Sequence, residues 1–298
     1  MFKRTAEFPT EKFCLVLTRS SRKNRDTMVA RSGSPFKQIS RFMITIKTSE
    51  EIKIMAEGGK ILAKIMKELE KQVKPGITTK ELDRLAESLV FKFGAKCSFK
   101  NYTGSGKNWD PYPACLCTSI NEEIVHALPS ERVLKEGDTL CLDFGVFCNK
   151  GFHTDMAITV PVGKVDKAAK RLIDVTKKAL EIGIKKIKPG NKIGDIGYVV
   201  QEYVEKQGFN VVRELCGHGI GRELHEKPDI LNFGEKGTGE EIKEGMVLCL
   251  EPMVTMGHWR IKKSKDGHGY KTKDNSLAAH FEHTIAVTKD GYKILTKI

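Results

Sequence analysis

Apolar residues recur at helical spacing along four stretches of the chain. In the first stretch Ile54, Ile61 and Ile65 belong to an apolar set with positions three or four residues apart, the period of one helix face. Thr48 with Glu51 begins that stretch with the Thr-x-x-Glu pattern of a capped helix start. The chain repeats this pattern at residues 78–81. The sequence predicts helices over 48–72, 78–93, 166–187 and 193–207.

Short apolar runs rich in β-branched residues predict strands between the helices. They lie around Thr118 and over 139–147, 156–162 and 278–287, and the last third of the chain is rich in strands. Because helices and strands arrive in alternating groups, the pattern favours an α+β fold. Residues 1–42 have no sustained period, so a disordered N-terminal extension and a folded domain over 43–298 are expected.

The chain also resembles itself. Residues 135–146 and 243–254 agree at seven of twelve positions, 108 residues apart, and Asp143 aligns with Glu251. Two weaker echoes occur in the same order. Lys74-Pro-Gly and Lys188-Pro-Gly each precede a predicted helix, and His126-x-x-Pro matches His225-x-x-Pro. The repeats predict two related halves, each of which brings one acid and one histidine to a shared centre.

Composition narrows the class of protein. The 298 residues are 40% hydrophobic and 30% charged, which argues against both a membrane protein and a disordered chain. No apolar run is long enough for a membrane span or a secretory signal, so the cytoplasm is the expected location. The eight cysteines include no Cys-x-x-C pair. Reduced, mostly buried thiols are therefore predicted.

Residues 1–42 carry much of the positive charge. They hold ten Lys or Arg against three acids, a net +7 of the +13 of the whole chain. Three interpretations stay open: a disordered extension or upstream start codon, a basic arm that contacts the ribosome or RNA, and an organelle-targeting segment. The remaining domain is only mildly basic.

Two aspartates in adjacent predicted strands need a shared partner. Asp143 lies in the apolar run 140–146, where an unpaired carboxylate is expensive to bury, and Asp155 lies in the next strand. A hairpin centred on Asn149 places the two aspartates opposite each other, with Cβ atoms about 5 Å apart. Two carboxylates at that distance repel unless a proton or a cation lies between them.

Three further residues complete a candidate metal site. Glu251 and Glu282 also lie in apolar runs, and His218 lies between glycines that allow a close backbone approach. Four carboxylates and one imidazole suit two divalent cations. Manganese, iron or cobalt fits such oxygen-rich ligands better than a structural zinc site would.

These residues stand in motifs that resemble a known family. The segments look like the five ligand motifs of type I methionine aminopeptidase, which has the pita-bread fold: Leu142-Asp-Phe-Gly-Val, Gly151-Phe-His-Thr-Asp155, Cys216-Gly-His-Gly-Ile-Gly-Arg222, Leu250-Glu-Pro-Met253 and Phe281-Glu-His-Thr284. The resemblance covers residues 43–298. It implies two pseudo-symmetric halves with a curved antiparallel sheet covered by helices, and a dinuclear centre of cobalt, manganese, iron or zinc. Its ligands would be Asp143, Asp155, His218, Glu251 and Glu282, with Asp155 and Glu282 bridging.

The resemblance also implies an activity. A metal-bridging hydroxide would attack the first peptide bond of nascent polypeptides and release the initiator methionine, with a preference for a small second residue. Glu251 would move a proton to the leaving amine, His225 would stabilise the oxyanion, and His126 would contact the substrate. Tyr112, Cys117 and Cys97 are expected to form the methionine pocket.

The sequence departs from the family in four places. The loop Ser98–Asp110 is longer than usual, Leu224 stands where Phe is common, His268 stands where Trp is common, and the hairpin between Asp143 and Asp155 is one residue longer. The first three bear on the shape of the methionine pocket. The last bears only on ligand register.

The same residues allow other interpretations. An X-Pro aminopeptidase or prolidase would share the fold and ligands but normally adds a large N-terminal domain. An inactive relative that binds RNA or protein would be expected to lack some ligands. His283 should point away from the ligand face, and His153 and His280 are interpreted as structural, although each shares the face of a ligand two residues away.

Overall fold

The computed structural model describes residues 43–104, 110–148 and 150–297. The extension 1–42 therefore lies outside the described residues. So do residues 105–109 of the long loop and Asn149, on which the predicted hairpin was centred.

The four predicted helices are confirmed. They are α2 (Ser49–Gln72), α3 (Thr79–Lys92), α4 (Lys167–Ile184) and α5 (Ile193–Lys206). The side chains of Thr48 and Thr78 cap the first two helices, and the carboxylate of the Glu three residues later accepts a hydrogen bond from the backbone N–H of each capping Thr. Helix α2 buries an apolar face that includes Met55, Leu62 and Ile65.

A central sheet of nine strands runs in the order β1-β4-β5-β14-β9-β7-β8, with β2 also on β4 and β15 also on β14. These strands are β1 (Lys96–Cys97), β2 (Leu116–Ile120), β4 (Thr139–Cys148), β5 (Phe152–Pro161), β7 (Cys216–Gly219), β8 (Glu226–Leu231), β9 (Val247–Leu250), β14 (Glu282–Thr288) and β15 (Gly291–Ile294). Every pair between them is antiparallel.

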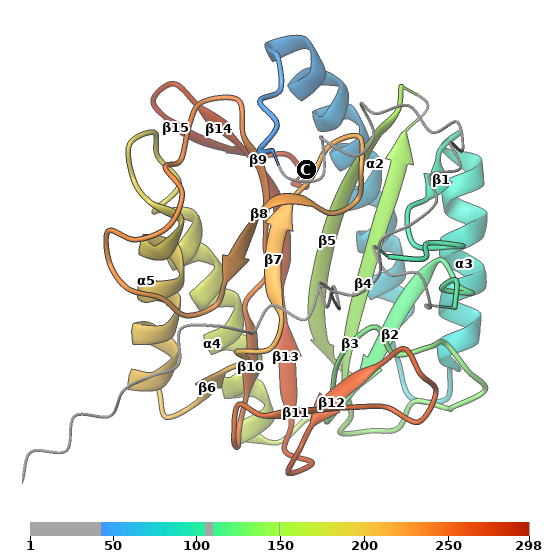
Figure 1. Cartoon of the computed structure of the whole chain (residues 1–298). Coiled ribbons are helices and arrows are strands. Elements are labelled where there is room, and N and C mark those ends of the chain that lie inside the picture. The colour runs from blue at the N-terminus through green and yellow to red at the C-terminus, as the bar shows by residue number, and fades with distance from the viewer. Residues whose placement is uncertain (1–42, 105–109, 149, 298) are drawn as a thin grey trace, which may run out of the picture.

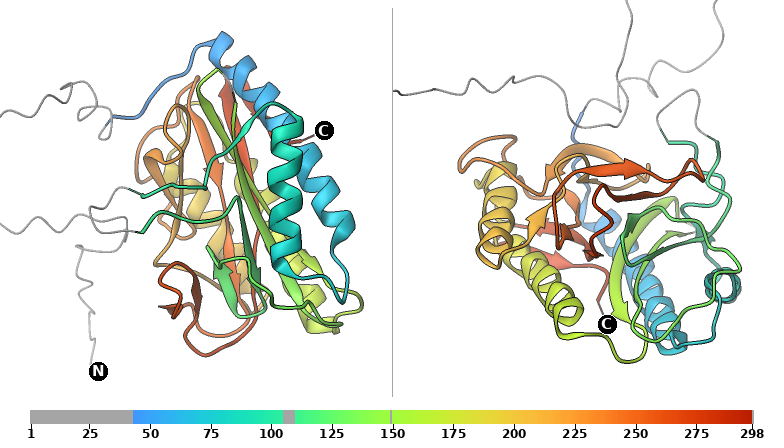
Figure 2. Two further views of the ribbon diagram at one scale, coloured as in Figure 1. Left: turned by 90° about the vertical axis from the view of Figure 1, so that its right-hand side faces the viewer. Right: turned by 90° about the horizontal axis from the view of Figure 1, so that it is seen from below.

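Two small sheets complete the fold. One has the order β13-β10-β6 and the other β11-β12-β3. Their strands are β13 (Ala278–His280), β10 (Met253–Thr255), β6 (Asn210–Val211), β11 (Ile261–Lys263), β12 (Tyr270–Thr272) and β3 (Glu123–Val125). In Figure 1, α2 and α3 lie on one side of the sheet's centre and α4 and α5 on the other. Both pairs cover the same face of the curved sheet (Figure 2). The α+β fold is confirmed.

The repeated segments adopt the same local structure. The amide of Gly76 donates to the carbonyl of Leu134 at 2.9 Å, and that of Gly190 donates to the carbonyl of Ile242 at 3.0 Å. Both glycines have positive φ (96° and 89°), where Gly has no Cβ penalty. Each turn then leads into a 14-residue helix, α3 or α5. The duplicated halves predicted from the repeats are thus present in the backbone.

The predicted hairpin register was wrong by two residues. Asp155 pairs with Gly145, and Asp143 pairs with Ala157. The two aspartates are therefore diagonal neighbours on one face rather than directly opposite each other. The predicted strand 278–287 was also wrong in its continuity, because it divides at Phe281 into β13 and β14, which belong to different sheets.

The prediction that the thiols are reduced was wrong for one pair. Cys97 and Cys115 form a disulfide across 18 residues. Strands β1 and β2 both pair with β4, at Val146–Phe147 and at Leu140–Phe144, so they lie one after the other along one strand edge. This arrangement brings Cys97 beside Cys115 although the sequence separates them. Cys117, Cys141, Cys148 and Cys249 form no disulfide within the described part of the chain.

None of the described helices combines the length and apolar character that a membrane span requires.

Candidate metal centre

Three carboxylates come together around Ala157, a residue of β5. Ala157 pairs with Asp143 of β4 on one side and with Glu282 of β14 on the other. Asp155 stands two residues before Ala157 and therefore faces the same way. One carboxylate oxygen from each of the three acids lies within 4.8 Å of the others. The three side chains are buried, with 6%, 3% and 2% of Asp143, Asp155 and Glu282 exposed.

Each of these three carboxylates keeps one buried oxygen without a hydrogen-bond partner among the described residues. The three atoms are Asp143 Oδ1, Asp155 Oδ1 and Glu282 Oε1. Burial raises the pKa of Asp155 to about 7. Burial, and then the charge of Asp155, raise the pKa values of Asp143 and Glu282. Buried acids with free oxygens at this spacing fit one or more divalent cations, since oxygen donors suit such ions.

His218 is held at the edge of this cluster by glycines. A Cβ on Gly217 would overlap the carbonyl oxygen of Cys249, and one on Gly219 would overlap that of Lys227. The close backbone approach predicted for this segment is confirmed. The His218 Nδ1 lies 2.8 Å from the Gly219 carbonyl oxygen and donates to it, which leaves Nε2 as the ligand atom. Burial lowers the pKa of His218 to about 4, so the ring is neutral at pH 7.

Glu251 lies between two histidines. Its Oε1 is 3.5 Å from His218 Nε2 and its Oε2 is 3.6 Å from His280 Nε2. His280 is 1% exposed, and its Nε2 makes no hydrogen bond among the described residues. His280 thus faces a predicted ligand, whereas the sequence favoured a purely structural role for it. His283 instead places Nδ1 2.9 Å from Thr296 Oγ1.

His225 and His126 are brought to the same region. The ring of His225 lies 4.3 Å from that of His218, centroid to centroid. Its Nδ1 is 2.6 Å from the hydroxyl of Tyr102, a residue that sequence reasoning did not identify. His126 has a positive φ of 61°, and burial together with His268 and His218 lowers its pKa to about 4.

Tyr112 and Cys117 share an apolar cluster beside the centre. Leu224 packs in the same cluster. The Tyr112 ring meets that of His268 edge to face, with centroids 5.6 Å apart. The predicted pocket residues Tyr112 and Cys117 and the two unusual residues therefore come together. Cys97 does not join them, because it is bonded to Cys115 and packs against a different core cluster.

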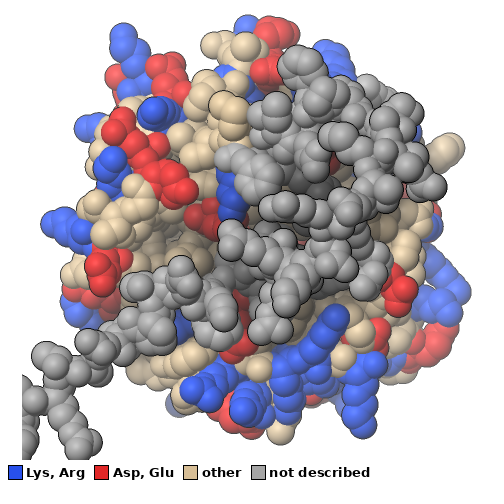
Figure 3. Space-filling view, in the orientation of Figure 1, with Lys and Arg blue, Asp and Glu red and all other residues tan. Residues whose placement is uncertain are grey.

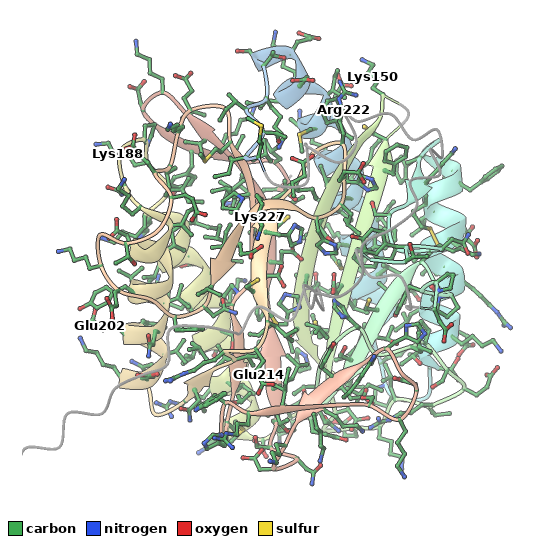
Figure 4. The ribbon with its side chains drawn as sticks, viewed as in Figure 1. Lys150, Lys188, Glu202, Glu214, Arg222 and Lys227 are labelled. Atoms are coloured by element: carbon green, nitrogen blue, oxygen red, sulfur yellow. A yellow bond between two sulfur atoms is a disulfide. The ribbon has the colours of Figure 1, made fainter. Side chains whose placement is uncertain are left out.

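The residues that follow His225 form β8, which pairs with β7 at one end of the central sheet. Figure 4 labels Lys227 beside β7, and it labels Arg222, which precedes His225, close to Lys150. The Arg222 guanidinium lies over the ring of Phe152 at 4.3 Å and donates to Glu51 at 3.0 Å. On the face shown in Figure 3, Lys and Arg mingle with Asp and Glu over the described surface, and the acids of the centre are internal.

Two further residues touch the cluster and were missed by sequence reasoning. The sulfur of Cys249, a ring nitrogen of His218 and an oxygen of Glu282 lie within 4.8 Å of one another. The Thr284 hydroxyl accepts from the amide of Asp155 at 2.8 Å and donates to its carbonyl at 2.7 Å. Alternation along the strands could have indicated both, since Cys249 and Thr284 each stand two residues from a predicted ligand.

The fold and this buried carboxylate cluster match a family of metal-dependent hydrolases. The sequence profile of metallopeptidase family M24 matches residues 53–289. The chain therefore belongs to metallopeptidase family M24.

Within that family the similar proteins are methionine aminopeptidases. Methionine aminopeptidase 1 of Bacillus subtilis is 45% identical over 256 residues, 86% of this chain and all of that protein. Methionine aminopeptidase of Escherichia coli is 41% identical over 255 residues, 85% of this chain and 94% of that protein. The crystal structure of methionine aminopeptidase from Rickettsia prowazekii has a TM-score of 0.82 and 42% identity, and covers 86% of this chain and 100% of its own. The resemblance found in the five motifs is thus confirmed.

A more distant relative shares the fold alone. The Xaa-Pro dipeptidase from Bacillus anthracis has a TM-score of 0.67 and 23% identity, and it matches 88% of this chain but only 64% of its own.

Proposed function

We propose that this chain is a metal-dependent aminopeptidase that removes the initiator methionine from nascent polypeptides, with a preference for a small second residue. The observation that carries the proposal is the convergence of three buried carboxylates whose free oxygens lie within 4.8 Å. Relatives that match over their whole length and are named methionine aminopeptidases support the choice of substrate.

Two divalent cations would be held by Asp143, Asp155, His218, Glu251 and Glu282. Cations at such a site would supply Lewis acidity, which makes a water more acidic and polarises a carbonyl group. Asp155 lies on the strand between those of Asp143 and Glu282, so the three acids face one common point. Cobalt, manganese, iron and zinc all suit a set of carboxylates and one imidazole.

The surrounding residues would move protons and orient the substrate. Glu251 faces the centre and would accept a proton at a carboxylate oxygen and deliver it to the leaving amine. The Tyr102 hydroxyl donates to Nδ1 of His225 in the proposed tautomer, so Nε2 carries the ring proton and can donate to the oxyanion. His126 is neutral at pH 7 and would contact the substrate near the scissile amide.

The methionine side chain would enter the cluster of Tyr112, Cys117 and Leu224. Tyr112 is held by its hydroxyl, which donates to the carbonyl of Ala127 at 3.1 Å. A largely apolar wall with one aromatic edge suits a flexible thioether. Cys97, which the sequence also placed in this pocket, is left out of the proposed pocket because its sulfur is bonded to Cys115.

Peptide cleavage distinguishes this function from its alternatives. The metal-loaded protein is expected to release methionine from Met-Ala-Ser and to leave Ala-Pro-Ser intact. Cleavage of Ala-Pro-Ser alone would identify an X-Pro peptidase. Failure to cleave either peptide, with two metals bound per chain, would indicate an inactive relative.

The proposal extends to the whole chain. Residues 43–298 would form the catalytic domain, acting as a monomer in the cytoplasm, where new N-termini emerge. The basic segment 1–42 would contact the ribosome, since a net charge of +7 is attracted to ribosomal RNA. Co-sedimentation of ribosomes with the full chain, but not with a chain that begins at Met43, would support this contact. Light scattering would test the monomer.

A further inference from the structure

A buried sulfur lies at the His218 side of the centre. Cys249 belongs to β9 and is completely buried. It pairs with His218 of β7 on one side and with Thr284 of β14 on the other. Its Sγ lies within 4.8 Å of both a ring nitrogen of His218 and a carboxylate oxygen of Glu282. Zinc or cobalt binds such donors at about 2.0 to 2.3 Å, so small side-chain movements would let all three share one ion.

The two neighbours of this sulfur are ready to bind a cation. Glu282 is 2% exposed, and its Oε1 is buried without a hydrogen-bond partner. His218 Nδ1 is engaged by the Gly219 carbonyl, so the lone pair of Nε2 is free. The Cys249 sulfur lies 3.5 Å from the hydroxyl of Thr284 and also contacts the Glu282 carboxylate. These contacts keep the sulfur beside a carboxylate that would bind the ion.

The internal repeat supplies a comparison within the same molecule. Cys141 stands two residues before Asp143, as Cys249 stands two before Glu251. The Cys141 sulfur lies 3.7 Å from Nδ1 of His280 and 3.9 Å from that residue's carbonyl oxygen. Cys141 is not among the described groups that could hold a metal ion. Of the two equivalent cysteines, only Cys249 therefore belongs to a described group of possible ligand atoms that lie within 4.8 Å of one another.

We propose that Cys249 supplies a sulfur ligand to the cation bound by His218 and Glu282. This inference rests on the proposed metal centre and adds a ligand to it. On binding, the S–H bond breaks, its proton passes to solvent, and the sulfur bonds to the cation. A nitrogen, sulfur and oxygen set favours zinc or cobalt over manganese, because sulfur is the softer donor. The two positions of the centre would then differ in metal preference.

Cobalt spectroscopy tests the sulfur ligand directly. The full chain is loaded with Co²⁺, bound cobalt is counted, and the near-ultraviolet spectrum is recorded for wild type, Cys249→Ser and Cys141→Ser. We expect a thiolate-to-cobalt charge-transfer band in wild type and in Cys141→Ser and its loss in Cys249→Ser. We also expect Cys249→Ser to weaken cobalt binding by about tenfold or more, with a smaller effect on manganese.

The outcomes separate the two proposals. Bound cobalt without the charge-transfer band in wild type would overturn the sulfur ligand and leave the carboxylate centre standing. A wild-type chain that binds no cobalt, manganese or zinc would overturn both. X-ray absorption of the wild-type cobalt protein needs no variant and therefore remains decisive if Cys249→Ser does not fold. A sulfur neighbour at about 2.3 Å supports the proposal, and a shell of only nitrogen and oxygen contradicts it.

Discussion

A buried ion pair ties the start of the domain to the loop that carries His225. Lys47 Nζ lies 2.6 Å from Glu226 Oε2, and the two side chains are 5% and 8% exposed. Thr45 donates to the same carboxylate, and the amide of Lys47 donates to the Gly245 carbonyl at 2.7 Å. Replacing Lys47 by Met removes the charge and keeps most of the side-chain volume.

The expected cost follows from what Lys47→Met leaves behind. Glu226 would remain buried with Thr45 and the amide of Glu223 as its donors but with no positive charge beside it. Breaking a buried pair by removing one partner costs about 3–5 kcal/mol, and the two remaining donors favour the lower end. Burial lowers the pKa of Lys47 in spite of the attraction to Glu226. Despite burial, the Lys47 charge and the hydrogen bonds from Lys47 and Thr45 lower the pKa of Glu226. The desolvation that the pair does not fully offset is therefore that of Lys47. The double variant Lys47→Met/Glu226→Gln should therefore recover much of the loss.

Urea unfolding of wild type, Lys47→Met, Glu226→Gln and the double variant measures the coupling between the two charges. The matched control is Lys80→Met, since Lys80 also lies 2.6 Å from its partner, Glu131, but the two side chains are 43% and 73% exposed. That exposed pair should cost less than about 1 kcal/mol. Because Glu226 follows His225, Lys47→Met should also lower kcat more than it raises KM.

A Lys47→Met protein as stable as Lys80→Met would show that the buried pair is no more costly to break than the exposed one, contrary to the expectation. A double variant whose loss equals the sum of the two single losses would show that the two charges are not coupled.

Further predictions concern the centre, its pH dependence and the disulfide. Gly217→Ala, whose Cβ would overlap the Cys249 carbonyl, should cost about 1–3 kcal/mol in urea unfolding and weaken metal binding, whereas Gly237→Ala, with nothing within 4 Å, should leave metal binding unchanged. His225→Ala should lower kcat about 10²–10³-fold with normal metal content by mass spectrometry; unchanged turnover would contradict its role. Metal affinity measured by calorimetry should fall about tenfold per pH unit for each displaced proton below pH 7, since the pKa of Asp155 is about 7 in the metal-free fold, and a flat profile would contradict this. That pKa lies above the ordinary 3.8, so this group makes the metal-free protein less stable as pH rises from about 4 to about 7, and chelation should lower Tm more at pH 8 than at pH 6. Cys97→Ser should lower the free energy of unfolding by about 3 kcal/mol, because the disulfide closes an 18-residue loop in the unfolded chain. Reduction should destabilise wild type by the same amount and leave Cys97→Ser unchanged; equal effects of reduction on the two proteins would contradict the role of the disulfide.

The features that sequence predicted well are those fixed by short-range rules. Helix starts at Thr48 and Thr78 depend on a residue three positions away, so the Thr-x-x-Glu pattern located both. The repeat located the two halves because the same turn occurs once in each half, with Gly76 or Gly190 at positive φ. Residue types alone also identified the acids that converge at the centre, since carboxylates in apolar strands require a partner.

The features that sequence missed depend on long-range placement. Pairing Asp143 with residue 155 or residue 157 keeps the same side chains on the same face, so the hydrophobic pattern cannot choose between the two registers. The disulfide needed the knowledge that β1 and β2 follow each other along β4. Tyr102 reaches His225 across 123 residues, and no local pattern marks such a contact.

Methionine release and metal content, measured together on one sample, test whether the buried acids hold the metal on which cleavage depends. Wild type and Asp155→Asn are titrated with Mn²⁺ while methionine release from Met-Ala-Ser is followed. Release by wild type is expected to rise with bound metal and to stop on chelation. Asp155→Asn is expected to bind less metal and to release methionine at least about 10²-fold more slowly, on the order of the loss of a main catalytic group. Equal metal binding and equal release by the two proteins would show that Asp155 does not hold a catalytic metal.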